Sequence, residues 1–232
     1  MNEKLFWILI EWSIECENDF FTNLKNKLIK YSESDIILFE EILRKKIIEA
    51  DHFNVMIAQK IMTGEISDDS YLYFICWIIC LWENIYNETI KNPDFLAHLE
   101  WIVEIDPDWE ELLYISDKAF EEKTWREVDE SFPRDVCFDK WINYDDSLLI
   151  NTKWEDWEEE DLKNRAPKLC ERFNFKLDNN FSYTQSVKTK DSENLINISE
   201  EEREKNKRAV IEKYEKIEKE KWEKYKKDNN IV

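Results

Sequence analysis

The chain has 232 residues and a net charge of −20, with one glycine, four prolines and 11 tryptophans. Hydrophobic residues make up 43% of it, which is enough for a packed interior and argues against disorder throughout. A single glycine excludes glycine-rich phosphate loops and dinucleotide-binding fingerprints, because each needs several glycines where the backbone approaches its ligand. Most familiar nucleotide-binding enzymes are thereby excluded.

The N-terminal part of the sequence has the period of amphipathic helices. Apolar residues recur every three or four positions over residues 5–28 and again over residues 36–47. Between these runs, Ser32 and Asp35 have the spacing of a capping box, which predicts that a helix begins there.

The single glycine, Gly64, lies between two apolar runs. Residues 53–62 predict a helix, and Gly64 fits a left-handed residue at its C-terminal end. Ser67 or Asp68 is expected to cap the next helix, a long apolar one over residues 71–90.

Prolines punctuate the following part of the chain. The segments 92–94 and 106–108 each have proline followed by aspartate, which predicts that one helix ends and another begins. The second restart predicts a helix over 109–125. Residues 134–153 are expected to be irregular or to contain one short helix, and a further short helix is expected from residue 166.

The last quarter of the sequence differs in composition. Residues 176–198 are polar and non-periodic, which predicts a linker. Residues 199–232 carry many acid-to-base pairs four positions apart, which predicts a charged C-terminal helix. We therefore expect an all-α protein: a compact multi-helix domain over residues 1–175, a polar linker and a charged helix.

One stretch resembles a known bacterial family. The residues that carry the resemblance are Met62-Thr63-Gly64-Glu65-Ile66-Ser67-Asp68-Asp69, then Tyr73-Phe74, Trp77-Ile78 and Asn92-Pro93-Asp94-Phe95-Leu96-Ala97. They are similar to the domain of unknown function 4240, and weaker similarity extends over about residues 1–175. The family pattern has two glycines before its Ser-Asp-Asp, where this chain has Gly64 followed by Glu65 and Ile66. The resemblance implies a helical fold and no particular activity.

Negative charge is concentrated in the middle of the chain. Residues 100–161 contain 22 acidic and 6 basic residues, a net charge of −16. Such a field repels nucleic acids and anionic membrane surfaces and attracts a basic protein. At its peak, two tryptophans lie among acids, and the candidate partner-binding residues are Trp154, Glu155, Asp156, Trp157, Glu158 and Glu159. The alternative is that both rings pack back onto the domain and the acids form a solvated face. The other tryptophans, Trp125 and Trp141 among them, are expected mostly in the core.

Few residues suggest catalysis. Ser67, Asp68 and Asp69 form a candidate polar site, since adjacent carboxylates at a helix N-terminus can hold a hard cation, although the same residues are what a capped helix start requires. The two histidines, His52 and His98, are expected at surface or capping positions. The five cysteines are odd in number and include no C-x-x-C, so neither a zinc ribbon nor a disulfide framework is indicated. Cys76 and Cys80 lie four apart on an apolar helix and are expected to pack in the core. No catalytic residue, metal or cofactor is predicted.

Three functions remain open from the sequence. The first is a non-enzymatic, acidic, cytoplasmic interaction protein, such as an immunity-type neutraliser of a basic toxin or nuclease. The second is a metal-dependent enzyme or small-ligand binder centred on Asp68 and Asp69. The third is a structural helical subunit. The cytoplasm is expected because the N-terminus lacks a signal peptide and the longest apolar run, 71–82, is too short to span a membrane.

Overall fold

The computed structural model describes residues 1–14, 19–64, 66–99, 102, 109–126, 129–144 and 159–175. The helices named below all belong to one compact unit of the chain, whereas Ile102 belongs to a second. Helices are the only regular elements in these described stretches, which confirms the all-α prediction. The linker and the charged C-terminal helix predicted after residue 175 lie outside the described residues and stay predictions.

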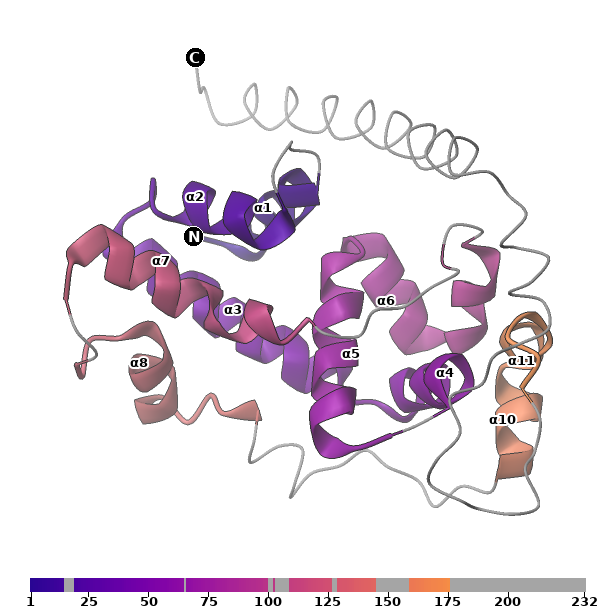
Figure 1. Ribbon diagram of the computed structural model, residues 1–232. Helices are drawn as coiled ribbons and strands as arrows, with labels where there is room; N and C mark the ends of the chain where they lie inside the picture. Colours follow the sequence, from indigo (N-terminus) through magenta and orange to yellow (C-terminus); the bar gives the residue numbers. More distant parts are fainter. Residues whose placement is uncertain are drawn as a thin grey trace. The chain divides into compact units, whose positions relative to one another are not determined.

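The helices follow one another closely along the chain (Figure 1). In order they are α1 (Glu3–Ile14), α2 (Phe20–Leu28), α3 (Glu33–Ala50), α4 (Phe53–Thr63), α5 (Asp68–Cys80), α6 (Glu83–Lys91), the 3-10 helices η1 (Pro93–His98) and η2 (Glu110–Tyr114), α7 (Ile115–Thr124), α8 (Pro133–Asp139), α10 (Glu159–Arg165) and α11 (Pro167–Arg172). None of the described helices combines the length and the apolarity that crossing a bilayer requires.

Helix α3 is the central element, because it contacts α1, α5, α7 and α8. Its apolar face is buried at Ile36, Phe39, Leu43 and Ile47, the four positions of the predicted stripe. The ring of Phe39 packs against Phe6 of α1 with 4.8 Å between centroids. The 3.6-residue period of the sequence thus corresponds directly to the face that α3 buries.

Helix α5 connects this arrangement to a second group of helices. It contacts α3, η2, α4 and α6, and it is apolar on nearly every side, which suits a helix enclosed by neighbours. Cys76 and Cys80 are both free and buried on α5, as expected for cysteines that act as small apolar residues. Burial raises the pKa of the Cys76 thiol far above its ordinary value, so it stays protonated.

Helix ends in the first half of the chain are capped as the sequence predicts. The Oγ of Ser32 accepts a hydrogen bond from the backbone N–H of Asp35 at 3.1 Å. Gly64 adopts the left-handed conformation with φ of 78°, and its N–H donates to the carbonyl of Lys60 at 3.0 Å. His52 caps α4 through Nδ1, which accepts from the N–H of Asn54 at 3.2 Å. Local side-chain chemistry therefore sets these boundaries.

The prediction of one long helix over 71–90 is wrong. The chain breaks at Leu81 and Trp82, and α6 begins at Glu83. Trp82 has a φ of 92°, which an L-residue rarely adopts, so neighbouring packing must hold it there. The turn lets Tyr86 of α6 reach α3, where its hydroxyl donates to the carbonyl of Lys46 at 2.7 Å.

The two helices expected after the proline segments are also different from the prediction. Residues after Asn92 form a 3-10 helix rather than an α-helix, and its N-cap is the side chain of Asn92, which accepts from the N–H of Asp94 at 3.1 Å. The helix expected over 109–125 is divided into η2 and α7.

Asp94 has a structural role that connects distant parts of the sequence. Its carboxylate is buried, and it accepts a hydrogen bond from the backbone N–H of Leu169 at 2.9 Å, in the first turn of α11. Arg172 of the same helix donates to the carbonyl of Ala97 at 2.8 Å. The Arg165 guanidinium lies over the ring of Phe53, 4.5 Å from its centroid. Asp94 therefore fixes α11 against η1.

Replacing Asp94 by alanine should detach this contact. The buried N–H of Leu169 would lose its acceptor, at a cost of about 1–3 kcal/mol in the free energy of unfolding. Urea denaturation followed by circular dichroism measures the loss. Asp94→Asn is the matched control, because its side-chain carbonyl can still accept, and an equal loss in both variants would contradict the assigned role.

Candidate functional site

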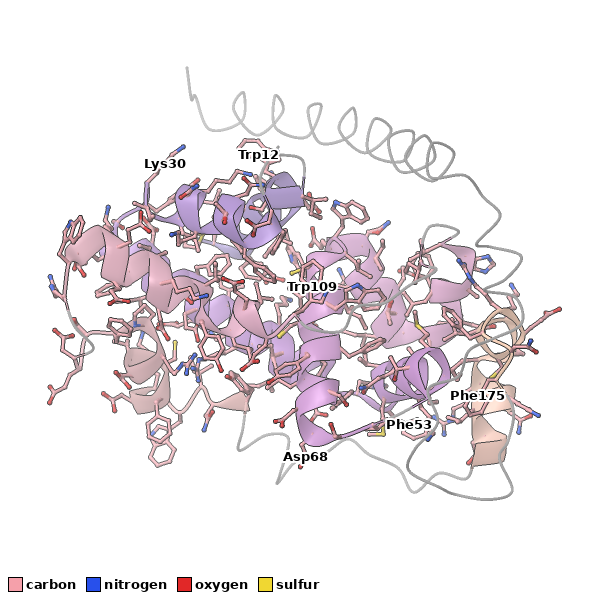
Figure 2. The ribbon with its side chains drawn as sticks, in the orientation of Figure 1. Trp12, Lys30, Phe53, Asp68, Trp109 and Phe175 are labelled. Atoms are coloured by element: carbon pink, nitrogen blue, oxygen red, sulfur yellow. The ribbon has the colours of Figure 1, made fainter. Side chains whose placement is uncertain are left out.

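The candidate polar site at Ser67, Asp68 and Asp69 forms the start of α5. The Oγ of Ser67 accepts from the N–H of Ser70 at 3.2 Å, and the Oγ of Ser70 accepts from the N–H of Ser67 at 2.8 Å. This reciprocal pair is a capping box. All three side chains are exposed, and Figure 2 shows Asp68 at the end of α5. Their geometry is that of a capped helix start.

The surroundings of Asp69 add hydroxyl groups and further acid. The hydroxyl of Tyr114 donates to a carboxylate oxygen of Glu110 at 2.8 Å. Burial, followed by a hydrogen bond to Glu110, raises the pKa of Tyr73 to about 12, and Asp69 adds to that shift. The phenols of Tyr73 and Tyr114 therefore stay protonated at neutral pH. Among the described residues, no group of three or more His, Cys, Asp or Glu side chains is arranged to hold a metal ion.

The acidic segment predicted to bind a partner lies almost entirely outside the described residues. Trp154, Glu155, Asp156, Trp157 and Glu158 are not described, and Glu159 is described only as the first residue of α10. The assignment of these residues to a partner-binding surface stays a prediction.

Two tryptophans that the sequence placed in the core are on the surface instead. Trp125 is 89% exposed and Trp141 is 90% exposed, while Trp7 and Trp77 are buried as expected. Phe138, in the last turn of α8, is 62% exposed. Whether a side chain is buried depends on which helix faces pack together. The spacing of apolar residues in the sequence does not show this, nor that both tryptophans follow the last turn of a helix.

Both exposed tryptophans have left-handed backbone conformations. Trp125 has a φ of 57° and Trp141 a φ of 59°, in the region where glycine is preferred after a helix. The N–H of Trp125 donates to the carbonyl of Glu121 at 2.8 Å, and that of Trp141 to the carbonyl of Phe138 at 2.9 Å. The left-handed conformation costs an L-residue roughly 1–2 kcal/mol relative to a right-handed one. The chain thus holds two large apolar side chains in water on strained backbone.

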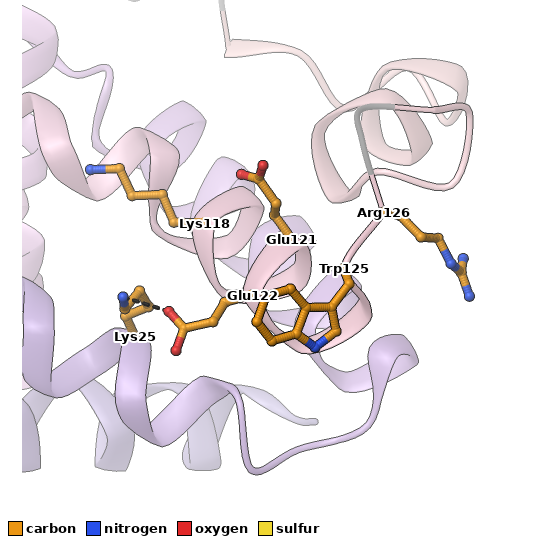
Figure 3. Close-up of a pocket in the computed structure, with 6 residues that line it drawn as sticks. All are labelled: Lys25, Lys118, Glu121, Glu122, Trp125 and Arg126. Carbon is orange, nitrogen blue, oxygen red and sulfur yellow. Dashed lines mark ion pairs between the residues drawn. The ribbon is translucent and has the colours of Figure 1, made fainter.

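Trp125 borders an open pocket of about 410 Å³ between α2 and α7 (Figure 3). The residues that line it are Lys25, Lys118, Glu121, Glu122, Trp125 and Arg126. Lys25 of α2 forms an ion pair with Glu122 of α7 at 2.6 Å, shown as the dashed line in Figure 3. Aromatic side chains are enriched in the core of protein interfaces, and polar groups surround that core.

A buried group of charges, absent from the sequence-based expectations, lies where α3, α7 and α8 meet. Glu40 and Arg44 of α3 are 1% and 3% exposed and pair at 2.6 Å between Oε1 and Nε. Ser116 of α7 donates to the other oxygen of Glu40, and Arg44 donates to the carbonyl of Ile142 at 3.3 Å. Burial lowers the pKa of Arg44, but the Glu40 carboxylate more than offsets this and raises it overall.

The sequence carried a signal for this pair. Glu40 and Arg44 lie four residues apart on the side of the helix that bears Ile36 and Ile47. Two opposite charges next to an apolar stripe, at a spacing that lets them pair, indicate a buried ion pair.

Asp117 forms the outer edge of this charged group. Its Oδ1 accepts from the backbone N–H of Arg134 at 3.3 Å, and its Oδ2 lies 3.3 Å from the Nε of Arg134. Arg134 also donates to the carbonyl of Leu113 at 2.8 Å and stacks over Tyr114. Burial, reinforced by the negative charge of Glu40, raises the pKa of Asp117 to about 6. These contacts join the first turn of α8 to α7, so the described geometry is that of a structural cluster.

Asp117 should make stability depend on pH in a defined direction. Between its ordinary value of 3.8 and about 6, the folded state keeps a proton that the unfolded state has lost. This contribution to stability is complete below about pH 4 and disappears as the pH rises through 6. The difference in unfolding free energy between wild type and Asp117→Asn should change by roughly 3 kcal/mol across that window. Urea denaturation from pH 3.5 to 7.5 measures it. Asp129→Asn is the control: Asp129 is exposed and its pKa is lowered, so this variant should not reproduce the change. A difference in unfolding free energy between wild type and Asp117→Asn that does not vary with pH would refute the assignment.

Comparison with known proteins gives one result. No curated protein matches the chain, and no solved structure does. A family model with the description "Protein of unknown function (DUF4240)" matches residues 1–122, which include Ser67, Asp68 and Asp69 but neither Trp125 nor Trp141. The weaker similarity expected up to about residue 175 is not part of that match. Because the matched segment is more than half of the 232 residues, the chain belongs to the DUF4240 family, as the sequence predicted.

Proposed function

We propose that the chain is a non-enzymatic interaction protein that binds a basic protein partner through its exposed tryptophans and their acidic surroundings. The observation that carries this proposal is the exposure of Trp125 and Trp141 on left-handed backbone. A tryptophan that is almost fully exposed gains little free energy from burial in the fold, whereas at an interface tryptophan is among the residues that contribute most binding energy.

The charge of the chain supports a basic partner. The net charge is −20, and the acidic block over 100–161 contains both tryptophans. Glu121 and Glu122 lie close before Trp125, and Asp139 lies two residues before Trp141; all three acids are exposed. Such surroundings repel phosphates and steer a positively charged protein to the aromatic anchors. The specific form that we propose is an immunity-type protein, acting in the cytoplasm, that neutralises a basic toxin or nuclease.

The enzyme alternative gains no support from the described residues. Asp68 and Asp69 are exposed, and their serine is engaged in capping α5. No described carboxylate, histidine or cysteine joins them in a group of three. An interaction role therefore accounts for more of the observed features.

Partner capture tests the proposed function. The immobilised full-length chain should retain a basic protein from an extract of the cells that encode it. The double variant Trp125→Ala/Trp141→Ala should retain at least about 30-fold less, since a hot-spot tryptophan contributes 2 kcal/mol or more. Leu38→Ala, at an exposed apolar residue of α3, is the control and should retain as much as wild type.

Two results would contradict the proposal. One is capture of an acidic protein through these tryptophans, and the other is undiminished capture by the double variant. A second arm reverses the charges of Glu155, Asp156, Glu158 and Glu159 to lysine. Loss of capture there would add the acidic segment to the binding surface.

Stability measurements test whether Trp141 serves binding at the expense of the fold. Trp141→Gly should raise the unfolding free energy by roughly 0.5–1 kcal/mol, because glycine removes the left-handed strain and little burial is lost. Phe138→Gly, three residues earlier inside α8, should lower it by about 1 kcal/mol or more. Urea denaturation of both variants gives the comparison. Destabilisation by Trp141→Gly as well would mean that this side chain is part of the fold.

A further inference from the structure

The pocket beside Trp125 contains both signs of charge, so its ligand preference depends on which charges are already paired. Each cation has a partner: Lys25 pairs with Glu122 at 2.6 Å, Lys118 with Glu111 at 2.6 Å, and Arg126 with Glu33 at 3.1 Å. An anionic ligand would have to compete with these carboxylates for every cation in the pocket.

Glu121 differs from the other charged residues of the pocket. It is exposed, and it forms no ion pair with any residue in the described part of the chain. Figure 3 shows that it projects from the last turns of α7, the helix that ends immediately before Trp125. A cation entering the pocket therefore meets a carboxylate without an internal competitor, in a pocket that the Trp125 indole also lines.

An indole ring adds a preference among cations. Its face attracts positive charge, and a planar guanidinium can stack on it while its N–H groups pair with a carboxylate. An ammonium is more strongly hydrated and lacks the flat surface for stacking. We infer that this pocket binds an arginine side chain of the basic protein partner, with the guanidinium against Trp125 and in ion pair with Glu121. This inference rests on the proposed function and names the partner's anchoring group.

Titration with short peptides tests the inference without the partner. The probes are acetyl-Gly-Arg-Gly-amide, its lysine analogue and its citrulline analogue, which keeps the shape of arginine without the charge. The full-length chain is labelled with ¹⁵N, and Trp125→Phe identifies the indole N–H resonance of Trp125. The arginine peptide should shift that resonance to saturation at low ionic strength. It should bind about 3-fold more tightly than the lysine peptide and at least about 5-fold more tightly than the citrulline peptide.

Two variants define the contacts. Glu121→Gln should weaken arginine binding about 3-fold, an effect of the size expected for an exposed ion pair. Glu130→Gln removes an exposed acid outside the pocket and should leave the affinity within experimental error. Equal binding of arginine and citrulline peptides, or equal affinity in Glu121→Gln and wild type, would overturn the inference.

Failure here is distinguishable from failure of the proposed function. If the peptides bind without selectivity while Trp125→Ala/Trp141→Ala abolishes partner capture, the function stands and the arginine pocket is wrong. If the double variant captures the partner as well as wild type, the function itself is wrong. Selective arginine binding by wild type, lost in Glu121→Gln, supports the pocket in either case.

Discussion

A chain with one glycine has to turn almost everywhere without one, and much of this structure follows from that constraint. Gly64 provides the left-handed turn between α4 and α5 at no steric cost. Trp125, Trp141 and Asn174 adopt the same conformation, and two of them are among the least suitable residues for it. Elsewhere side chains supply the missing hydrogen bonds, as Ser32, His52, Ser67 and Asn92 do at helix starts. Each helix end therefore depends on the particular residue at that position, either a capping side chain or a residue in the left-handed conformation.

The buried pair of Glu40 and Arg44 organises the interior in a comparable way. Two charges removed from water need every available partner, and they find them on three different elements: on α3 itself, at Ser116 of α7 and at the carbonyl of Ile142 after α8. The directed hydrogen bonds from Ser116 to Glu40 and from Arg44 to the carbonyl of Ile142 are made in the observed orientation of α7 and α8 on α3. Cys137 is buried beside it, and burial, followed by the charge of Glu40, raises the pKa of its thiol to about 12. The Cys137 thiol is therefore protonated at neutral pH, and the role of the charged group is to position helices.

The sequence was informative where structure is set locally and uninformative where it is set by packing. Ser32, Gly64 and Ser67 were predicted correctly because a cap involves residues only three or four apart. The break at Leu81 and Trp82 was missed because neither proline nor glycine marks it. It is explained by the packing of α6 against α4 and by the hydrogen bond from Tyr86 of α6 to α3. The exposure of Trp125 and Trp141 was missed for the same reason, since an aromatic residue at a helix end is read as core until its neighbours are known. Of the residues proposed for function from sequence, the Ser67 group is a cap, and the Trp154 segment is still a prediction.

The combination of strain, exposure and charge at Trp125 points to selection for something other than stability. Residues after helices are easily replaced by glycine or asparagine, which would relieve the backbone and remove apolar surface from water. Position 125 instead has the largest side chain, beside a carboxylate that no described residue neutralises, at the rim of an open pocket. Backbone strain, an exposed ring or an unpaired carboxylate can each occur alone in a stable fold. Together at one place, the three are unfavourable to the isolated chain. They become favourable together when a cationic group occupies the pocket, because it covers the ring and pairs with the acid in a single contact.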